Sequence, residues 1–334
     1  MSSTSPTRRL DTLNLLWLDT THALITSYRG RLAELDKQIA AAPKGHKNKN
    51  RDRNQIGNGG DILPAAVGPV ARRKLIHSFR QFLGKEEEFW RTLCGRFASR
   101  LYPEEAAELR SVGIVATSFL SANDPGLSES HAVPDHVAQE AERDRLRAGV
   151  LPLAHKALIC FGDLARYSEL YSETSAGQPP VESHKGRGRG GRRGGGKAAG
   201  NAPADRRIKT YTKAAECYSQ ARLLLPDNGQ FRSQSARAVS VLTLLTESHA
   251  GNPSNQLAVL AQYAADPLSS VYHYYRALCV RSPFATAKAN LRITFSKAVA
   301  RWFAPDGGEP DGDDAERFKA AFIALHGIFF TKQQ

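Results

Sequence analysis

Apolar residues recur along this chain with the period of an α-helix. They fall at helical spacings between Leu10 and Leu35, and again between Leu75 and Phe97. Pro, Gly and Asn separate such segments, as they do where helices end. The pattern predicts helices over residues 10–40, 69–100, 103–119, 135–171, 207–225, 254–264, 268–280, 284–302 and 315–330. Because strand-like alternation is scarce, we expect an all-α protein.

The segment 151–171, LPLAHKALICFGDLARYSELY, combines a predicted buried face with a specific pair of polar residues. Its apolar stripe consists of Leu158, Phe161, Leu164 and Ala165. Arg166 and Tyr167 follow at the edge of that stripe. Arg166 fits two interpretations from the residues alone: a helix arginine paired with a nearby carboxylate, or a ligand for an anion.

Two basic tracts account for most of the net charge of +13. Residues 181–209 hold nine Lys or Arg against two acidic residues, and residues 44–53 hold five against one. The first tract contains GRGRGGRRGGG, which is too rich in Gly and Arg to bury apolar area. We therefore predict a disordered insert over 172–206. It is either a passive linker or a nucleic-acid-binding segment, and in the second case its candidate residues are Arg187, Arg189, Arg192 and Arg193.

The cysteines, the apolar runs and the N-terminus indicate the compartment in which we expect the protein. The four cysteines are Cys94, Cys160, Cys217 and Cys279, far apart and in apolar contexts, so we expect buried thiols and a reducing compartment. No apolar run approaches the length of about 18 residues that a membrane span needs. The N-terminus lacks a secretory pattern. We expect no membrane association, no cofactor or metal, and a location in the nucleus and cytoplasm.

An internal repeat appears in the second half of the chain. Ala214, Tyr218, Ala221 and Pro226 follow the small, aromatic, small and proline positions of a tetratricopeptide repeat. Ser270, Tyr274, Ala277 and Pro283 repeat that order. Without the residues 231–252, the two copies are separated by about 34 residues, the period of this repeat class. We therefore predict an insertion at 231–252, either a surface insert or a retained intron.

Several ordered segments resemble the Est/Smg proteins, which serve telomerase and nonsense-mediated mRNA decay. They are RKLIHSFRQFLGKEEEFW (73–90), ICFGDLARYSE (159–169), YTKAAECYSQARLLLPDNG (211–229), the long segment 253–291 and FKAAFIALHGIFF (318–330). The resemblance implies a 14-3-3-like domain with tetratricopeptide-type hairpins. It predicts an N-terminal 14-3-3-like half over 1–171, hairpins over 207–302 and the start of a truncated helical-hairpin domain over 315–334.

The resemblance also implies a phosphate-binding site. In 14-3-3 proteins an Arg-Tyr pair on one helix and basic residues on another hold the phosphate, and Arg166 and Tyr167 match the pair. Arg73 and Arg80 are two helical turns apart and match the second helix. Arg72 and Lys74 compete with Arg73 for this role.

Three functions remain open from the sequence. The first is a non-catalytic adaptor of nonsense-mediated decay that binds a phosphorylated partner, by resemblance the RNA helicase of that pathway. The second is a telomerase-associated protein that binds telomerase subunits, telomerase RNA or telomeric single-stranded DNA. The third is a truncated family member without independent function. A heterodimer with another family member is a further expectation.

Overall fold

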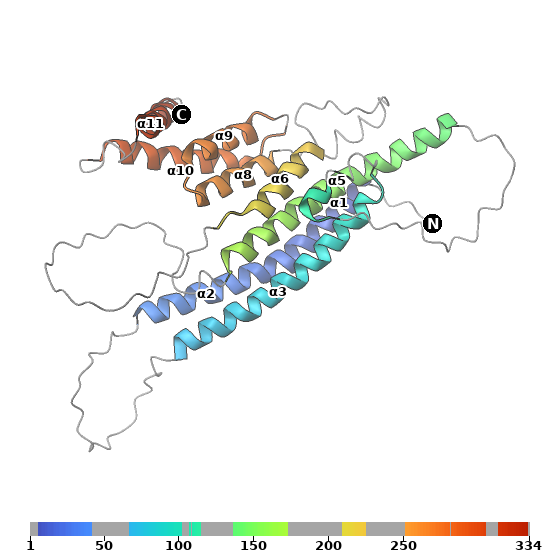
Figure 1. Cartoon of the computed structure of the whole chain (residues 1–334), viewed down its shortest axis with the longest axis horizontal. Coiled ribbons are helices and arrows are strands. Elements are labelled where there is room, and N and C mark those ends of the chain that lie inside the picture. Colours follow the sequence, from blue (N-terminus) through green and yellow to red (C-terminus); the bar gives the residue numbers. More distant parts are fainter. Residues whose placement is uncertain are drawn as a thin grey trace, which may run out of the picture. The chain divides into compact units, whose positions relative to one another are not determined.

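The computed structural model describes residues 6–41, 67–101, 107, 109–114, 136–172, 209–224, 251–280, 282–304 and 313–332. These residues form helices joined by short turns and contain no strand (Figure 1). The all-α prediction is therefore confirmed. The predicted insertion 231–252 and the predicted insert 172–206 lie almost wholly outside the described residues.

The helices begin and end close to the Pro, Gly and Asn residues that separate the predicted segments. They are α1 (Pro6–Leu15), η1 (Leu16–His22), α2 (Ala23–Ala41), α3 (Val67–Ala98), η2 (Arg110–Val112), α5 (His136–Leu170), α6 (Thr212–Leu224), α8 (Asn252–Tyr263), α9 (Pro267–Leu278), α10 (Ala285–Trp302) and α11 (Asp314–Lys332). The first predicted helix is thus one helical run in which η1 is a π-helical stretch. Such stretches add a residue to a turn of an α-helix.

Two predicted helices are shorter than expected. The helix predicted over 207–225 begins only at Thr212, because Tyr211 adopts the left-handed conformation with φ of 52°. The helix predicted over 103–119 is interrupted, since the 3₁₀ turn Arg110–Val112 ends at Gly113 with φ of 75°. Glycine adopts this conformation without steric cost, and a helix ends where it does.

The described chain divides into two compact units. Unit 1 comprises Met1–Trp17, Glu86–Arg166 and Thr210–Gln334, and unit 2 comprises Leu18–Lys85 and Tyr167–Lys209. Both α3 and α5 contribute residues to each unit. Each unit is therefore described separately below.

The second half of unit 1 is a series of helices that pack on their sequence neighbours. In this series α6 contacts α8, α8 contacts α9, α9 contacts α10, and α10 contacts α11. The core of α8 to α11 consists of Ala258, Val271, Tyr274, Ala277, Ala287, Leu291, Phe295 and Ile323. The repeat positions Ala214, Tyr218, Ala221, Ser270, Tyr274 and Ala277 are all buried. Their burial fits the packing that the repeat pattern predicts, while the tetratricopeptide class stays a prediction.

Unit 1 holds three buried thiols, one on each of α3, α5 and α6. Trp17 and Trp90 meet edge to face with their ring centroids 5.4 Å apart. Cys94, Cys160 and Cys217 are buried, as predicted, and burial raises the pKa of each thiol. Cys279 is exposed, so the expectation of four buried thiols was wrong there. Its position follows the last turn of α9, where the apolar stripe has ended.

None of the described helices has both the length and the apolar character needed to cross a membrane.

Candidate functional site

Aromatic side chains join the helices of unit 2. The ring of Tyr28 on α2 stacks on Phe79 of α3 with a centroid distance of 4.8 Å, and Phe82 lies 5.7 Å from Tyr28. Phe79 also meets Tyr171, just after α5, at 4.9 Å. These contacts fix the register of α2 and α3 against the end of α5. The residues that follow Tyr28 and Phe79 in the chain are both arginines.

Arg29 lies on Tyr167. Its guanidinium carbon is 5.5 Å from the centroid of the phenol ring, and Nη1 donates to the Tyr167 hydroxyl over 3.4 Å. A cation against the face of an aromatic ring is attracted by the ring quadrupole. The phenol of the predicted Arg-Tyr pair therefore has a guanidinium beside it within unit 2.

Arg80 binds the C-terminal end of α5. Its Nε donates to the backbone carbonyl of Tyr171 over 2.5 Å. Lys209 donates to the neighbouring carbonyl of Leu170 over 2.6 Å. The last carbonyls of a helix lack intrahelical partners, and cations are favoured there. Burial lowers the pKa of Lys209, although Glu169 opposes this effect.

The neighbouring basic residues of α3 differ in their surroundings. Arg72 forms an ion pair with Asp36 of α2 at 2.5 Å. Arg73 and Lys74 are exposed. The ion pair makes Arg72 the weaker of the three candidates, because Asp36 already neutralises its charge. Arg73 and Arg80 remain two turns apart on α3, as the sequence predicts.

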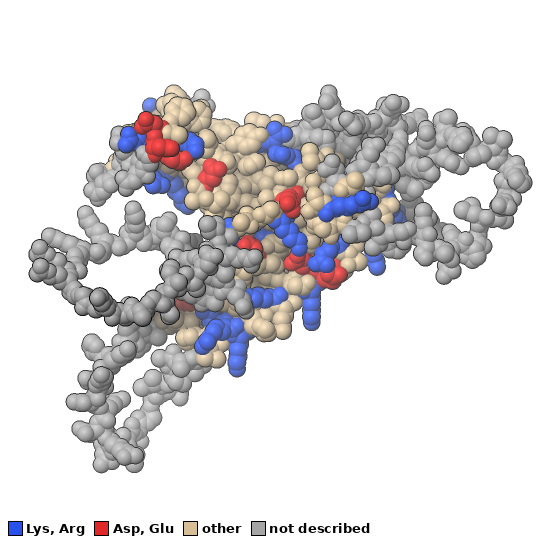
Figure 2. Space-filling model, viewed as in Figure 1, with Lys and Arg blue, Asp and Glu red and all other residues tan. Residues whose placement is uncertain are grey.

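Unit 2 has an excess of positive charge. Its described residues include nine Lys or Arg against four Asp or Glu. In the face drawn in Figure 2, Lys and Arg side chains stand out along α3. The field around such a surface attracts anions and falls off within about 8 Å at physiological salt.

Arg166 lies in unit 1 and is buried there, with 8% of its surface exposed. Its Nη2 donates to Oδ1 of Asp163 over 3.0 Å, and its Nε lies 3.4 Å from the hydroxyl of Tyr218 on α6. The Tyr218 hydroxyl donates to the same carboxylate oxygen over 2.7 Å. Burial and the Asp163 charge raise the pKa of Tyr218 well above its ordinary value. These bonds give Arg166 a structural role, and its role in phosphate binding stays a prediction.

Gly162 allows this arrangement. A Cβ added there would lie 2.7 Å from Cε1 of Tyr218 and 3.1 Å from Cβ of Cys217. Both distances are shorter than ordinary carbon contacts, so a side chain at this position would push α6 away from α5. The Gly in GDLARY therefore serves the packing of Tyr218 beside Asp163.

The second predicted site is the group of arginines in the basic tract. Arg187, Arg189, Arg192 and Arg193 lie outside the described residues. In the part of the chain that the structure describes, no group of three His, Cys, Asp or Glu side chains is placed to hold a metal ion.

Arg29 was not among the residues predicted for the site. It belongs to the exposed positions of a long amphipathic helix, and the sequence contains no pattern that separates it from Arg31. The only available signal was its place directly after Tyr28, an aromatic residue within the apolar pattern between Leu10 and Leu35.

The chain is an all-α protein that matches two family models along its length. "Telomerase activating protein Est1" matches residues 11–172, and "Est1 DNA/RNA binding domain" matches residues 247–334. The chain belongs to the Est/Smg family. The resemblance predicted from the sequence is thereby confirmed.

Relatives named for mRNA decay and for telomerase binding are similar to it. The nonsense-mediated mRNA decay factor SMG7 of Arabidopsis thaliana is 29% identical over 44% of this chain and 9% of its own length. SMG7 of Danio rerio is 33% identical over 31% of this chain and 9% of its own length. The telomerase-binding protein EST1A of Danio rerio is 28% identical over 43% of this chain and 6% of its own length. The chain thus corresponds to a small part of each relative.

Proposed function

We propose that this protein is a non-catalytic adaptor of nonsense-mediated mRNA decay that binds a phosphorylated Ser or Thr segment through unit 2. The observation that carries the proposal is the convergence of Arg29 and Arg80 on the C-terminal turn of α5, at Tyr167 and Tyr171. A guanidinium offers phosphate oxygens a planar pair of donors, and a phenol adds another. Arg73 extends the basic surface along α3.

Membership of the family supports the choice of partner. Two of the relatives described above are decay factors by name, so we assign the protein to that pathway. The proposed ligand is the phosphorylated RNA helicase of nonsense-mediated decay, in the nucleus and cytoplasm. A heterodimer with another family member would bring two such surfaces together and increase avidity.

Charge reversal tests this proposal. The full chain is titrated with a labelled phosphoserine peptide, and Arg73→Glu and Arg29→Glu are each compared with the unchanged protein. We expect each change to weaken binding about tenfold or more, because a carboxylate replaces a cation beside the phosphate.

Arg31→Glu is the matched control. Arg31 is exposed on α2, two residues from Arg29, and belongs to another face of that helix. Its reversal makes the same change in net charge and should leave the affinity within about twofold. If all three variants bind equally, unit 2 does not hold the phosphate at this surface.

Nucleic-acid binding is the second candidate function. The observation in its favour is the match of residues 247–334 to the Est1 DNA/RNA binding domain, together with the relative named as telomerase-binding. The basic tract with Arg187, Arg189, Arg192 and Arg193 would add contacts to the phosphate backbone.

Salt dependence tests the nucleic-acid candidate. Binding to a labelled telomeric single strand should weaken steeply with salt and lose most of its salt slope when residues 184–200 are deleted. An unchanged slope after the deletion would remove the basic tract from this function.

A further inference from the structure

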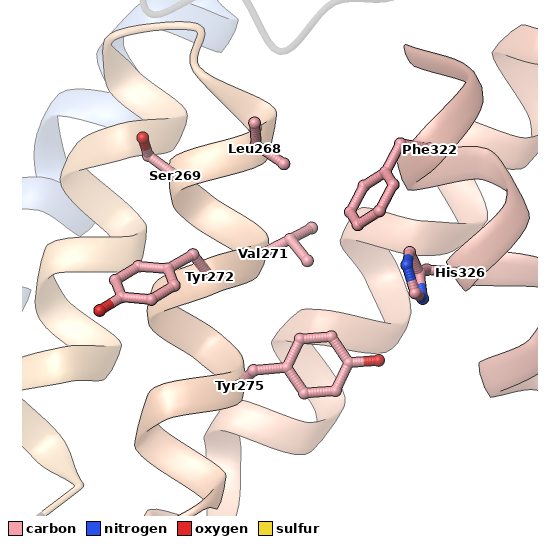
Figure 3. A pocket seen from close by; sticks show the side chains of 7 residues that line it. All are labelled: Leu268, Ser269, Val271, Tyr272, Tyr275, Phe322 and His326. Carbon is pink, nitrogen blue, oxygen red and sulfur yellow. The ribbon is translucent and has the colours of Figure 1, made fainter. Parts of the chain in front are cut away.

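A groove lies between α9 and α11 in unit 1, and none of its lining residues belongs to the proposed phosphate site. It has a volume of about 640 Å³ and is lined by Leu268, Ser269, Val271, Tyr272, Tyr275, Phe322 and His326. In Figure 3 the side chains of Val271 and Tyr275 point toward Phe322 and His326. The lining is therefore largely apolar and aromatic, with no Lys or Arg.

The helix α11 is apolar on two opposite faces. Ile323, Ala324 and Gly327 are buried on one face. The other face carries Phe318, Phe322, Leu325 and Phe329, which are 69%, 41%, 50% and 56% exposed. Their spacings of four, three and four place them in one stripe. A helix that is apolar on both sides is normally covered on both sides.

Charge is distributed unevenly along this surface. All four carboxylates among the described residues of 251–332 lie at the N-terminal ends of α9 and α11: Asp266, Asp313, Asp314 and Glu316. The helices α9 and α11 contact each other, and the charge of Lys319 on α11 helps to lower the pKa of Asp266 at the start of α9. Lys319 and Arg317 offset only part of the negative charge. One end of an apolar surface is thus acidic, in a chain with a net charge of +13.

We propose that the groove and the exposed stripe of α11 together bind an amphipathic helix of a protein partner. That helix would present large apolar residues at spacings of three and four, in the helix-in-groove mode. Its basic end would lie at the acidic end of α9 and α11. Charge complementarity supports a basic peptide over a nucleic acid, because the carboxylates repel phosphates and the groove offers no cation to hold them. This surface adds a second docking site to the proposed phosphate site.

A designed peptide provides the test on the full chain. The probe is a labelled helical peptide of about 16 residues, with leucines at spacings of four, three and four and lysines at one end. Fluorescence anisotropy measures its affinity. We expect Phe322→Ala and Leu325→Ala each to weaken binding about tenfold, since each removes a large apolar contact. Leu325 is 50% exposed, so Leu325→Ala should leave the thermal unfolding temperature nearly unchanged, and it therefore separates loss of binding from loss of stability.

Two controls separate this proposal from its alternatives. Ile293→Ala removes another exposed apolar side chain, 52% exposed on α10, and should leave the affinity unchanged. A second peptide with glutamates in place of the lysines should bind more weakly than the first. Asp314→Lys should reduce that preference. Equal effects of Phe322→Ala and Ile293→Ala would overturn the proposal.

Other occupants would also overturn it. If a labelled single-stranded oligonucleotide binds the chain and is released by Phe322→Ala, the groove holds nucleic acid. If sedimentation shows a dimer that Leu325→Ala dissociates, the occupant is a second copy of the chain.

Discussion

The guanidinium of Arg166 is buried and forms hydrogen bonds within its own chain. It shares Asp163 with the Tyr218 hydroxyl: the Arg166–Asp163 bond lies within α5, and the bonds from Tyr218 to Asp163 and from Arg166 to Tyr218 join α5 to α6 within unit 1. A buried charge that loses its partner is costly, because its remaining charge is neither solvated nor compensated. We therefore expect the effect of an Arg166 substitution on stability to depend on whether Asp163 is still present.

Truncation of Arg166 should destabilise the fold. We expect Arg166→Ala to lower the free energy of unfolding by about 3–5 kcal/mol, measured by urea denaturation, because Asp163 is left buried without its cation. Adding Asp163→Ala should recover part of this loss. Arg301→Ala is the control, since Arg301 is exposed on α10. A loss no larger than that of Arg301→Ala would contradict the structural part assigned to Arg166.

At the residue scale, burial could be predicted and partners could not. Helical spacing correctly assigned Leu158, Phe161 and Leu164 to the core. It could not pair Arg166 with Tyr218, which is 52 residues away in sequence. It also gave no reason to choose Arg29. Such pairs depend on how helices pack, which periodicity alone does not determine.

At the scale of the elements, residues close in sequence determine where some helices begin and end. Asp266 precedes Pro267 and caps α9, with its carboxylate accepting from the backbone N–H of Ser269 over 3.0 Å. The sequence placed this boundary, because Pro267 separates the helices predicted over 254–264 and 268–280. It misplaced the start of α6, because the left-handed conformation of Tyr211 has no sequence signal. The helix predicted over 103–119 also missed the left-handed conformation of Gly113, at which the 3₁₀ turn ends.

Because the cap at Asp266 is a carboxylate, we predict that the stability it contributes depends on pH. Partial burial opposes ionisation, but the hydrogen bonds from Ser269 prevail and lower the pKa of Asp266. A lowered pKa contributes stability above its ordinary value of about 4, and the contribution is lost as pH falls through the folded-state pKa. We expect Asp266→Ala to cost about 1 kcal/mol at neutral pH.

Thermal unfolding at two pH values checks this expectation. The deficit of Asp266→Ala relative to the unchanged protein should shrink as pH falls through the folded-state pKa of Asp266, because the carboxyl then becomes protonated. Asp266→Asn keeps a capping oxygen and should cost less at neutral pH. A deficit of Asp266→Ala that is equal at both pH values would contradict an ionised cap.

At the scale of the whole molecule, the all-α class and the family followed from ordered segments of sequence. Proline and glycine residues marked where most helices begin or end. The small and aromatic repeat positions are buried in unit 1. The 14-3-3-like and tetratricopeptide assignments remain predictions, as do the domain limits at 171, 206 and 302. The division into two units was not predicted, because it runs through α3 and α5, which the pattern treats as continuous.

The account of function depends on recognition of a phosphate by unit 2. Isothermal titration of the full chain with a phosphoserine peptide and its unphosphorylated counterpart tests this most directly. We expect the phosphorylated peptide to bind at least about tenfold more tightly, with a preference that falls as salt increases. Equal affinities for the two peptides would contradict the account.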